Sequence, residues 1–317
     1  LNYPHFRGVL GLVRSVLIMT LIFEAVGILI GLIVFARDYP LPQALGISAF
    51  HSISAFNNAG FDILPGDGLL FYQNNALLLL MTCVLTIAGS LGFFVIHDMV
   101  TKRRFRRFSL HSKVVLATSG GILLLGTLLL KATGNISWLT AFFVSAASRT
   151  SGFATFPTAG LGSAALLILM TLMFIGGSPG STAGGIKTTT FFVLIRTISA
   201  TISGKRIQAF HRSLPQDLSR RALVAAVLGI AVIIGSAILL CLAQPQHDFM
   251  PLLFEAVSAA ATVGLSTGIT PELSALAKII LIVTMFIGRL GLLTMATMWL
   301  EKSQVDVAYA EESVSIG

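Results

Sequence analysis

The chain has 317 residues, of which 55% are hydrophobic and only 11% charged, and it carries a formal net charge of +8. Soluble domains contain about 25% charged residues, so this composition, with a mean hydropathy of +0.89, indicates an integral membrane protein. The positive charge does not favour a nucleic-acid-binding protein, because basic residues gather in two short loops between apolar runs, where membrane-orientation signals belong.

The first predicted unit opens with a spanning helix over about residues 15–36, and a short apolar helix follows over about 44–56. At about 1.5 Å per residue, 13 residues reach less than about 20 Å, which is too short to cross a bilayer. This short helix stops at a loop around Gly60, and the long apolar run 76–96 comes next. The chain is therefore predicted to enter the membrane part-way, turn at a glycine and leave again.

The same arrangement recurs twice, and we interpret the recurrence as internal repeats. Gly152 and Gly264 occupy the position of Gly60, and 24 residues separate each of them from a glycine in the next helix, Gly176 and Gly288. The second unit is predicted from a helix at 114–130, a short helix at 138–148 and an apolar run at 164–186. The third is predicted from a helix at 222–244, a short helix at 249–261 and the segment "MFIGRLGLL".

Lysine and arginine set the predicted orientation. Six of them lie in the loop 102–113 and five in the loop 204–221, so both loops are predicted to be cytoplasmic. The short helices would then enter from the outside of a cell membrane that the chain crosses several times. The basic loops are interpreted as solvated, with contact to a cytosolic partner as a further possibility.

The glycine loops are the candidate ion-binding site. Non-helical backbone at membrane depth is tolerated only where it is buried in protein or lines a polar path. Backbone carbonyl oxygens can replace the hydration shell of a potassium ion, and glycine adds no side chain to the lumen. The alternative, that each glycine only makes a turn, fits one copy better than three. The predicted filter residues are Asn58, Ala59, Gly60, Thr150, Ser151, Gly152, Thr262, Val263 and Gly264.

Several stretches resemble one known family. "SAFNNAGF", "RTSGF", "ATVGLSTGITPEL", "MFIGGSPGSTAGGIKTTTF" and "MFIGRLGLLT" are similar to the Ktr/Trk/HKT superfamily of potassium transporters, and most of all to its bacterial KtrB type. The resemblance covers nearly the entire chain. Ser151 is a mild departure, because the family usually has alanine before this glycine.

The resemblance implies an all-α membrane protein with four helix–pore-loop–helix repeats around a pseudo-fourfold pore, of which this chain shows three. A pore without a quarter of its ring would leak or fail, so we expect the sequence to be a fragment that lacks the first repeat; a natural three-repeat protein is the alternative. The expected divisions are a cytoplasmic linker at 1–14, the second repeat at 15–108, the third at 109–212, the fourth at 213–300 and a cytoplasmic tail at 301–317.

The resemblance also implies function and partners. It implies potassium uptake, passive or coupled to sodium by symport, by a homodimer of pore subunits in the lipid bilayer. A cytosolic ring of KtrA/TrkA-like regulatory subunits would bind the nucleotide, which this chain would not bind itself. K⁺ would be the transported ion at the filter carbonyls, with Na⁺ as a second transported ion if transport is coupled, and no nucleic acid is expected as a partner.

The segment "MFIGGSPGSTAGGIKTTTF" cannot form a continuous helix, because glycine costs about 1 kcal/mol and proline about 3 kcal/mol in a helix interior. The family resemblance implies that this segment forms an intramembrane loop that gates the pore below the filter. A phosphate-binding loop is excluded, because Lys187 does not directly follow the glycine as that motif requires. The predicted gate residues are Gly176, Gly177, Ser178, Pro179, Gly180, Gly184, Gly185, Lys187 and Arg289.

Charged residues within apolar segments are functional candidates, because insertion of arginine costs about 2.5 to 3.5 kcal/mol. Arg289 is expected to be buried, and the family resemblance implies that it contacts carbonyl groups of the gating loop; helix packing with snorkelling is the alternative. Glu24 is expected to have a partner within the protein. Glu255 either attracts cations toward the filter or braces a neighbouring loop.

The chain is not predicted to be an enzyme, since its six histidines show no catalytic or metal-binding spacing. The rival to a transporter is a truncated membrane scaffold that docks the regulatory ring and conducts no ion. The two hypotheses differ in whether a fourth glycine loop is encoded upstream of Leu1.

Overall fold

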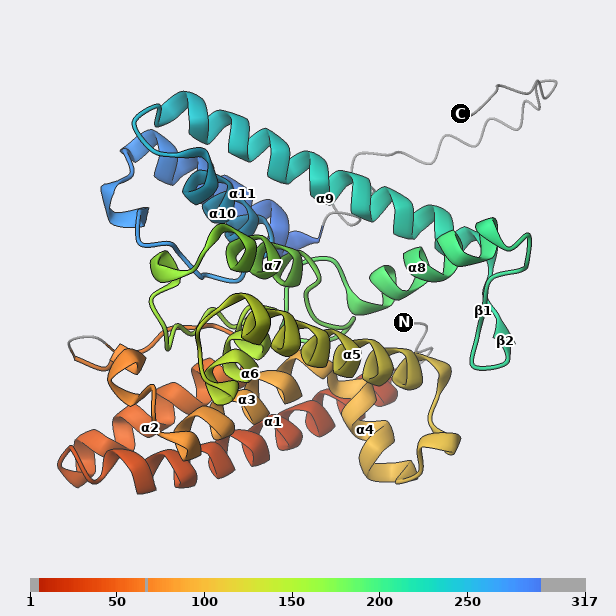
Figure 1. Ribbon diagram of the computed structural model, residues 1–317. Helices are drawn as coiled ribbons and strands as arrows, with labels where there is room; N and C mark the ends of the chain where they lie inside the picture. Colours follow the sequence, from red (N-terminus) through yellow and green to blue (C-terminus); the bar gives the residue numbers. More distant parts are fainter. Residues whose placement is uncertain (1–5, 66–67, 292–317) are drawn as a thin grey trace.

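The computed structural model describes residues 6–65 and 68–291, and these residues are mostly α-helical, as predicted (Figure 1). In chain order the α-helices are α1 (Phe6–Phe35), α2 (Leu41–Phe56), α3 (Ala76–Leu91), α4 (Phe93–Lys102), α5 (Leu110–Thr133), α6 (Trp138–Ala147), α7 (Ser163–Phe174), α8 (Thr188–Ile202), α9 (Gln216–Ala243), α10 (Phe249–Ala260) and α11 (Ala275–Leu290).

Shorter elements connect the helices. The 3₁₀ helices are η1 (Gly68–Tyr72), η2 (Phe105–Arg107), η3 (Thr158–Gly160) and η4 (Thr270–Glu272). A two-stranded antiparallel hairpin, β1 (Gln208–Ala209) and β2 (Arg212–Ser213), lies between α8 and α9. Its turn residues, Phe210 and His211, both have positive φ, as the tight turns of hairpins require.

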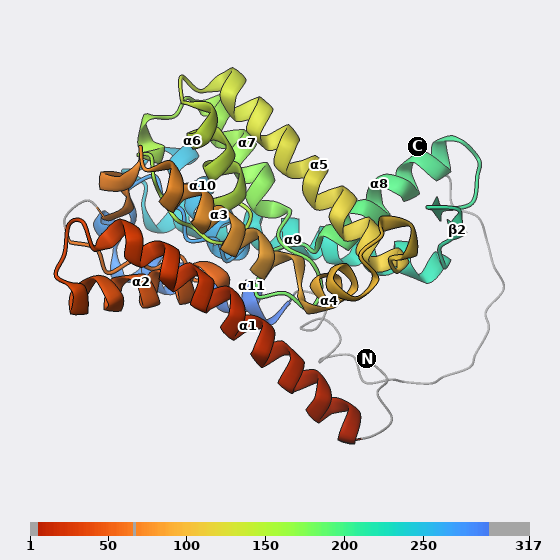
Figure 2. The same cartoon turned by 90° about the horizontal axis from the view of Figure 1, so that it is seen from below.

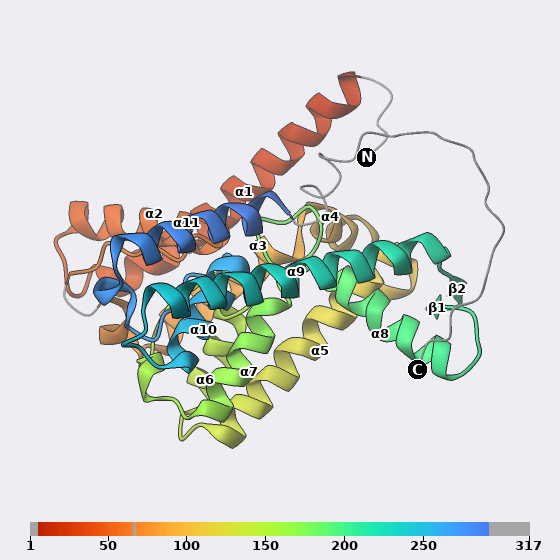
Figure 3. The same cartoon turned by 90° about the horizontal axis from the view of Figure 1, so that it is seen from above.

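The helices form three successive groups. The long helix α1 packs against α2 and α3, α5 packs against α6 and α7, and α9 packs against α10 and α11. Contacts of α3 with α6 and of α7 with α10 join neighbouring groups. Figure 1 places α1 and α9 on opposite sides of the molecule, and Figures 2 and 3 show that the α5–α7 group is displaced to one side of both.

Small residues bring the long and short helices close together. A Cβ built on Gly27 of α1 would lie 2.2 Å from Ser52 Oγ of α2, and one on Gly126 of α5 would lie 2.5 Å from Ser145 Oγ of α6. A side chain at either position would require the neighbouring serine and leucine side chains to shift. Close approach at small residues is typical of helix pairs in membranes.

Three helices in the described part of the chain are long and apolar enough to cross a membrane, namely Gly11–Phe35 within α1, Leu110–Thr133 and Gln216–Ala243. They correspond to the predicted spans at 15–36, 114–130 and 222–244. Large apolar side chains remain exposed on them, such as Leu21 and Leu29 on α1. This is the surface that lipid would cover.

The run 76–96 is not the single straight span that its length predicts. Helix α3 ends at Leu91, α4 begins at Phe93, and the chain bends by 100° between them. Gly92 makes the bend with φ 84° and ψ 151°, a conformation that side-chain-bearing residues rarely adopt. The apolar run masks this break, because only the backbone angles of one glycine distinguish it from a continuous helix.

The run 164–186 is also interrupted, as its glycines and proline predict. Helix α7 ends at Phe174, and the next helix, α8, begins at Thr188. The expected linker at 1–14 is helical from Phe6 onward, so most of it belongs to α1. The expected tail at 301–317 lies outside the described residues, and the other repeat boundaries stay predictions.

Candidate ion pathway

A glycine loop follows each of the three short helices. The first loop (57–65) follows α2, the second (148–157) follows α6 and the third (261–269) follows α10. The predicted glycines all have positive φ, 73° at Gly60, 71° at Gly152 and 94° at Gly264. Only glycine takes such angles without steric cost, so the local sequence explains why the helices end here.

The structure brings the three loops together in a row. A Cβ built on Gly60 would lie 1.9 Å from the carbonyl oxygen of Ser151, and one built on Gly152 would lie 2.0 Å from the carbonyl oxygen of Val263. The first loop therefore abuts the second, and the second abuts the third. A Cβ on Gly264 meets no described atom within 4 Å, so the row is open at this end.

The residue that follows a loop glycine packs into the preceding helix group wherever the structure describes that group. Phe153 is buried in the α1–α3 core, where its ring centroid lies 5.1 Å from that of His51 on α2. Leu265 is buried in the core of the preceding α5–α7 group. Phe61, the corresponding residue of the first loop, is 70% exposed. The first and second groups thus each receive a side chain from the next group, and no described group covers Phe61.

Among the predicted filter residues, Asn58 connects three segments. Its Nδ2 donates to Thr182 Oγ1 at 2.8 Å, and its Oδ1 accepts from Thr150 Oγ1 at 3.1 Å. The neighbouring Asn57 donates to Glu24 Oε1 at 3.0 Å. Both asparagine side chains therefore brace the loop, and Glu24 has the partner within the protein that the sequence led us to expect.

The predicted filter positions differ in exposure. Those that the protein buries are Asn58, Thr150, Ser151 and Val263, those that are partly exposed are Gly60, Gly152 and Thr262, and those that are exposed are Ala59 and Gly264. Asn58 and Thr262, each two residues before a loop glycine, both have positive φ, which is uncommon for residues with side chains.

The predicted gate residues between α7 and α8 form one compact loop, residues 175–187. Its ends are held together, because Gly176 N donates to Ile186 O at 2.9 Å and Ile186 N donates to Phe174 O at 3.1 Å. Its middle reaches the broken end of α3, where Ser178 N donates to Ser90 O at 3.0 Å and Ser178 Oγ to the same oxygen at 2.7 Å. The 175–187 loop therefore satisfies carbonyl groups that the bend after α3 leaves free.

The 175–187 loop touches all three glycine loops. Thr182 bonds to Asn58 of the first loop. Gly176 O accepts from Arg149 Nη2 of the second loop at 3.2 Å. Gly184 is so close to the third loop that a Cβ on it would overlap Thr262 Oγ1. Residues that the sequence assigned separately to a filter and to a gate are thus in direct contact.

Two basic side chains among the predicted gate residues also donate hydrogen bonds to backbone oxygens of this loop. Arg289 Nη1 donates to Thr182 O at 2.8 Å, and Lys187 Nζ donates to Ala183 O at 2.7 Å. Arg289 lies in the last turn of α11, and its side chain is exposed, so the expectation of a buried arginine is wrong. In the described part of the chain, the side of α11 that carries Arg289 is exposed.

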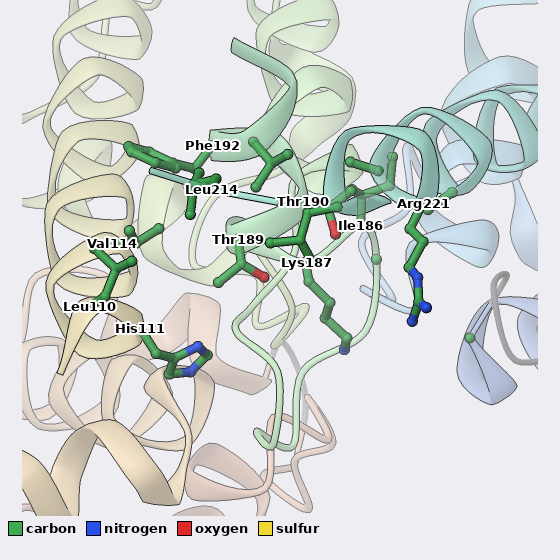
Figure 4. Close-up of a pocket in the computed structure, with 16 residues that line it drawn as sticks. Leu110, His111, Val114, Ile186, Lys187, Thr189, Thr190, Phe192, Leu214 and Arg221 are labelled. Carbon is green, nitrogen blue, oxygen red and sulfur yellow. The ribbon is translucent and has the colours of Figure 1, made fainter. Parts of the chain in front are cut away.

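Lys187 also borders a cleft of about 540 Å³ between α5, α8 and α9 (Figure 4). The cleft walls are apolar, with Val114, Phe192 and Leu214 among them, and His111 and Arg221 are on its rim together with Lys187. The end of the 175–187 loop and the start of α8 therefore both line this cleft.

Sequence reasoning missed Arg149. This side chain is only 3% exposed and lies immediately before the predicted filter residues of the second loop. An arginine at the end of an otherwise uncharged short helix was a signal that could have identified it. For Glu255 the sequence left two roles open, and the structure shows bracing contacts, because its carboxylate accepts from Ser266 Oγ at 2.5 Å and from Thr270 Oγ1 at 3.0 Å.

The chain is similar to known cation transport proteins. The family model described as "TrkH: Cation transport protein" matches residues 5–140 and 121–305. "Potassium/sodium uptake protein NtpJ" of Enterococcus hirae is 34% identical over 335 residues, which cover all of this chain and 74% of that protein. "Ktr system potassium uptake protein B" of Bacillus subtilis is also 34% identical, with the same shares covered.

The fold has a solved counterpart. The crystal structure of the potassium transporter TrkH from Vibrio parahaemolyticus matches with a TM-score of 0.70 and 18% sequence identity, over 90% of this chain. This chain spans 64% of the length of that one. The fold and the family match thus define a membrane transport protein. The chain belongs to the TrkH family of cation transport proteins and is not an enzyme.

Proposed function

We propose that this protein takes up potassium across the cytoplasmic membrane through a filter formed by the glycine loops, which the 175–187 loop gates. The observation that carries the proposal is the contact of Gly60 with Ser151 O and of Gly152 with Val263 O. Three loops of bare backbone in one row can present their carbonyl oxygens to one dehydrated ion. The ion-binding residues proposed are those predicted from the sequence, from Asn58–Gly60, Thr150–Gly152 and Thr262–Gly264.

The three helix groups would be three of four repeats around a pseudo-fourfold pore. In that arrangement each glycine abuts a carbonyl of the next repeat, and each following side chain packs into the preceding repeat. The open side of Gly264 and the 70% exposure of Phe61 support a further repeat between the third and first groups. Helices α2, α6 and α10 would direct their partly negative C-terminal ends toward the ion.

The 175–187 loop would close the pore on the cytoplasmic side of the filter. Its contacts with all three glycine loops support this position. Arg289 and Lys187 would hold the loop closed by bonding its carbonyls, and their charges would oppose the passage of a cation. Opening would then require the middle of the loop to move away from the pore axis.

The remaining parts of the proposal concern the assembly. The basic loops 102–113 and 204–221 would face the cytoplasm and dock a ring of nucleotide-binding regulatory subunits, with two pore subunits per assembly. The similarity to proteins named for potassium/sodium and potassium uptake supports K⁺ as the transported ion, with or without coupling to Na⁺. A nucleotide would act through the ring and not through this chain.

Growth of a potassium-uptake-deficient bacterium at low potassium tests the proposal. We expect the natural full-length protein to restore growth and the Gly152→Asp variant to fail, although both reach the membrane in equal amounts. Normal growth of the variant would remove the second loop from the filter. Failure of the natural protein itself would favour the rival hypothesis, a scaffold that docks the regulatory ring without conducting ions.

A second measurement tests the gate. Shortening the segment from Gly177 to Gly184 should raise rubidium or potassium flux into vesicles that lack the regulatory partner. The rise is expected because the shortened connection cannot reach the first glycine loop. Unchanged flux would contradict a gating role while leaving the filter proposal in place.

A further inference from the structure

Arg149 is the most unusual charged residue of the described chain outside the predicted sites. Its side chain is 3% exposed. The ion pairs found among the described residues are Lys102–Asp98 and Arg221–Asp217, so in this part of the chain no carboxylate neutralises Arg149. Burial of a charge is costly unless the charge is paired and hydrogen-bonded, so a position like this requires a physical explanation.

Two neutral acceptors and two helix ends surround the guanidinium. Nη2 donates to Ser119 Oγ of α5 at 3.3 Å and to Gly176 O at 3.2 Å. Arg149 lies two residues after Ala147, the last residue of α6, and Gly176 lies two residues after Phe174, the last residue of α7. The C-terminal end of a helix carries a partial negative charge, so these two helices supply the compensation that no side chain provides.

The position of Arg149 gives it two roles at once. Its backbone continues directly into Thr150 and Gly152 of the second glycine loop, whereas its side chain bonds the base of the 175–187 loop. The base is closed by the pairing of Gly176 with Ile186. If Gly176 moved away, the guanidinium would lose an acceptor in a site with little access to water, and the free energy of the second glycine loop would change.

We propose that Arg149 is a positioning residue that couples the second glycine loop to the gate, by holding the base of the 175–187 loop at Gly176. Gate movement is then confined to the middle of the 175–187 loop. Displacement of the base of that loop would change the free energy of the second glycine loop. This inference rests on the proposed transport function and adds a specific route by which filter and gate influence each other.

The test is a double-mutant cycle on the natural full-length protein in vesicles without the regulatory partner. Arg149→Lys keeps the charge but shortens the reach to Gly176 O, so leak flux of rubidium should rise by about fivefold or more, the lower range of measured couplings. In the variant with the shortened 177–184 segment the gate is already open, and Arg149→Lys should add nothing. Equal rises in both backgrounds would mean that Arg149 supports the filter alone, and would overturn the proposal.

Arg196→Lys is the matched control, because Arg196 also donates to a backbone oxygen, that of Gln208, but is exposed on α8. It should leave leak flux unchanged. A wild-type protein without uptake would refute the proposed function and this inference together. Wild-type uptake with an inert Arg149→Lys would refute the inference alone.

A second variant covers the case in which Arg149→Lys does not assemble. Ser119→Asp supplies the carboxylate that the guanidinium lacks and should draw it away from Gly176 O, raising leak flux with Arg149 intact. Ser119→Ala removes the same hydroxyl without adding a charge, so it should raise leak flux less than Ser119→Asp does. Wild-type flux in an assembled Ser119→Asp variant would contradict the proposal independently.

Discussion

The carbonyl oxygen of Val263 lies 2.0 Å from the point at which a side chain on Gly152 would begin. Two segments more than one hundred residues apart in the sequence are therefore in backbone contact, and the contact excludes every residue except glycine. The same relationship joins Ser151 to Gly60. Several consequences of these contacts can be measured.

Gly152→Ala should abolish potassium uptake. The added methyl overlaps Val263 O, and φ at this position is positive, so strain and overlap together cost about 2 to 5 kcal/mol. Uptake of rubidium by cells measures the effect. The matched control is Gly121→Ala in α5, where a Cβ meets nothing within 4 Å; a loss of uptake there as well would show that the assay reports general damage.

Asn58→Leu should lower the stability of the closed state. The change removes the bonds to Thr182 and Thr150 and leaves their hydroxyls without this partner, at a cost of about 1 to 3 kcal/mol. Thermal unfolding in detergent should occur at a lower temperature, and leak flux should rise. Asn58→Asp keeps the acceptor for Thr150 but loses the donor to Thr182, so a leak as low as that of the wild type in this variant would contradict the importance of the Thr182 bond.

Glu255→Gln should lower stability more than apparent potassium affinity. The carboxylate accepts from Ser266 and Thr270, and bonds to a charged group contribute about 1.5 to 3 kcal/mol. The glutamine can serve only one of these hydroxyls as an equivalent acceptor. Thermal unfolding and the concentration dependence of uptake should be measured together. A large loss of apparent affinity with unchanged stability would instead favour the cation-attracting role.

Gly92→Ala should disturb the bend between α3 and α4 and, through it, the 175–187 loop. A Cβ on Gly92 lies 3.0 Å from the carbonyl oxygens of Pro179 and Gly180, and the backbone angles at this position cost about 1 to 3 kcal/mol for a residue with a side chain. We expect lower thermal stability and a higher leak flux. In Gly46→Ala on α2, where a Cβ meets nothing within 4 Å, both quantities should stay at or above their wild-type values.

The sequence predicted the helices that repeat with a strong apolar pattern. The short helices expected at 44–56, 138–148 and 249–261 are observed as α2, α6 and α10, with boundaries that differ by three residues at most. Positive φ at the loop glycines was also predictable, because glycine was the shared residue at the end of each short helix. These features are local, and local pattern was sufficient to find them.

Features that depend on tertiary contact were not predictable in the same way. The apolar run 76–96 gave no sign that Gly92 would take a non-helical conformation, since the bend is stabilised by Ser178 and its neighbours from a distant segment. Arg289 was expected inside the protein, and the described chain leaves it exposed. Arg149 was missed because a helix end compensates its charge, and no acidic residue in the sequence marked it.

The bend after α3 has a consequence for the gate opening proposed above. The carbonyl groups of Gly89 and Ser90 accept hydrogen bonds from Thr182 N and Ser178 N. An outward movement of the 175–187 loop would therefore leave these carbonyl oxygens without hydrogen-bond donors at membrane depth. Carbonyl groups without a hydrogen-bond donor are not tolerated in hydrocarbon, so water would have to donate to them instead. In the proposed mechanism, gate opening and hydration of these carbonyl groups are then a single event, and the open fraction should fall when an impermeant osmolyte withdraws water.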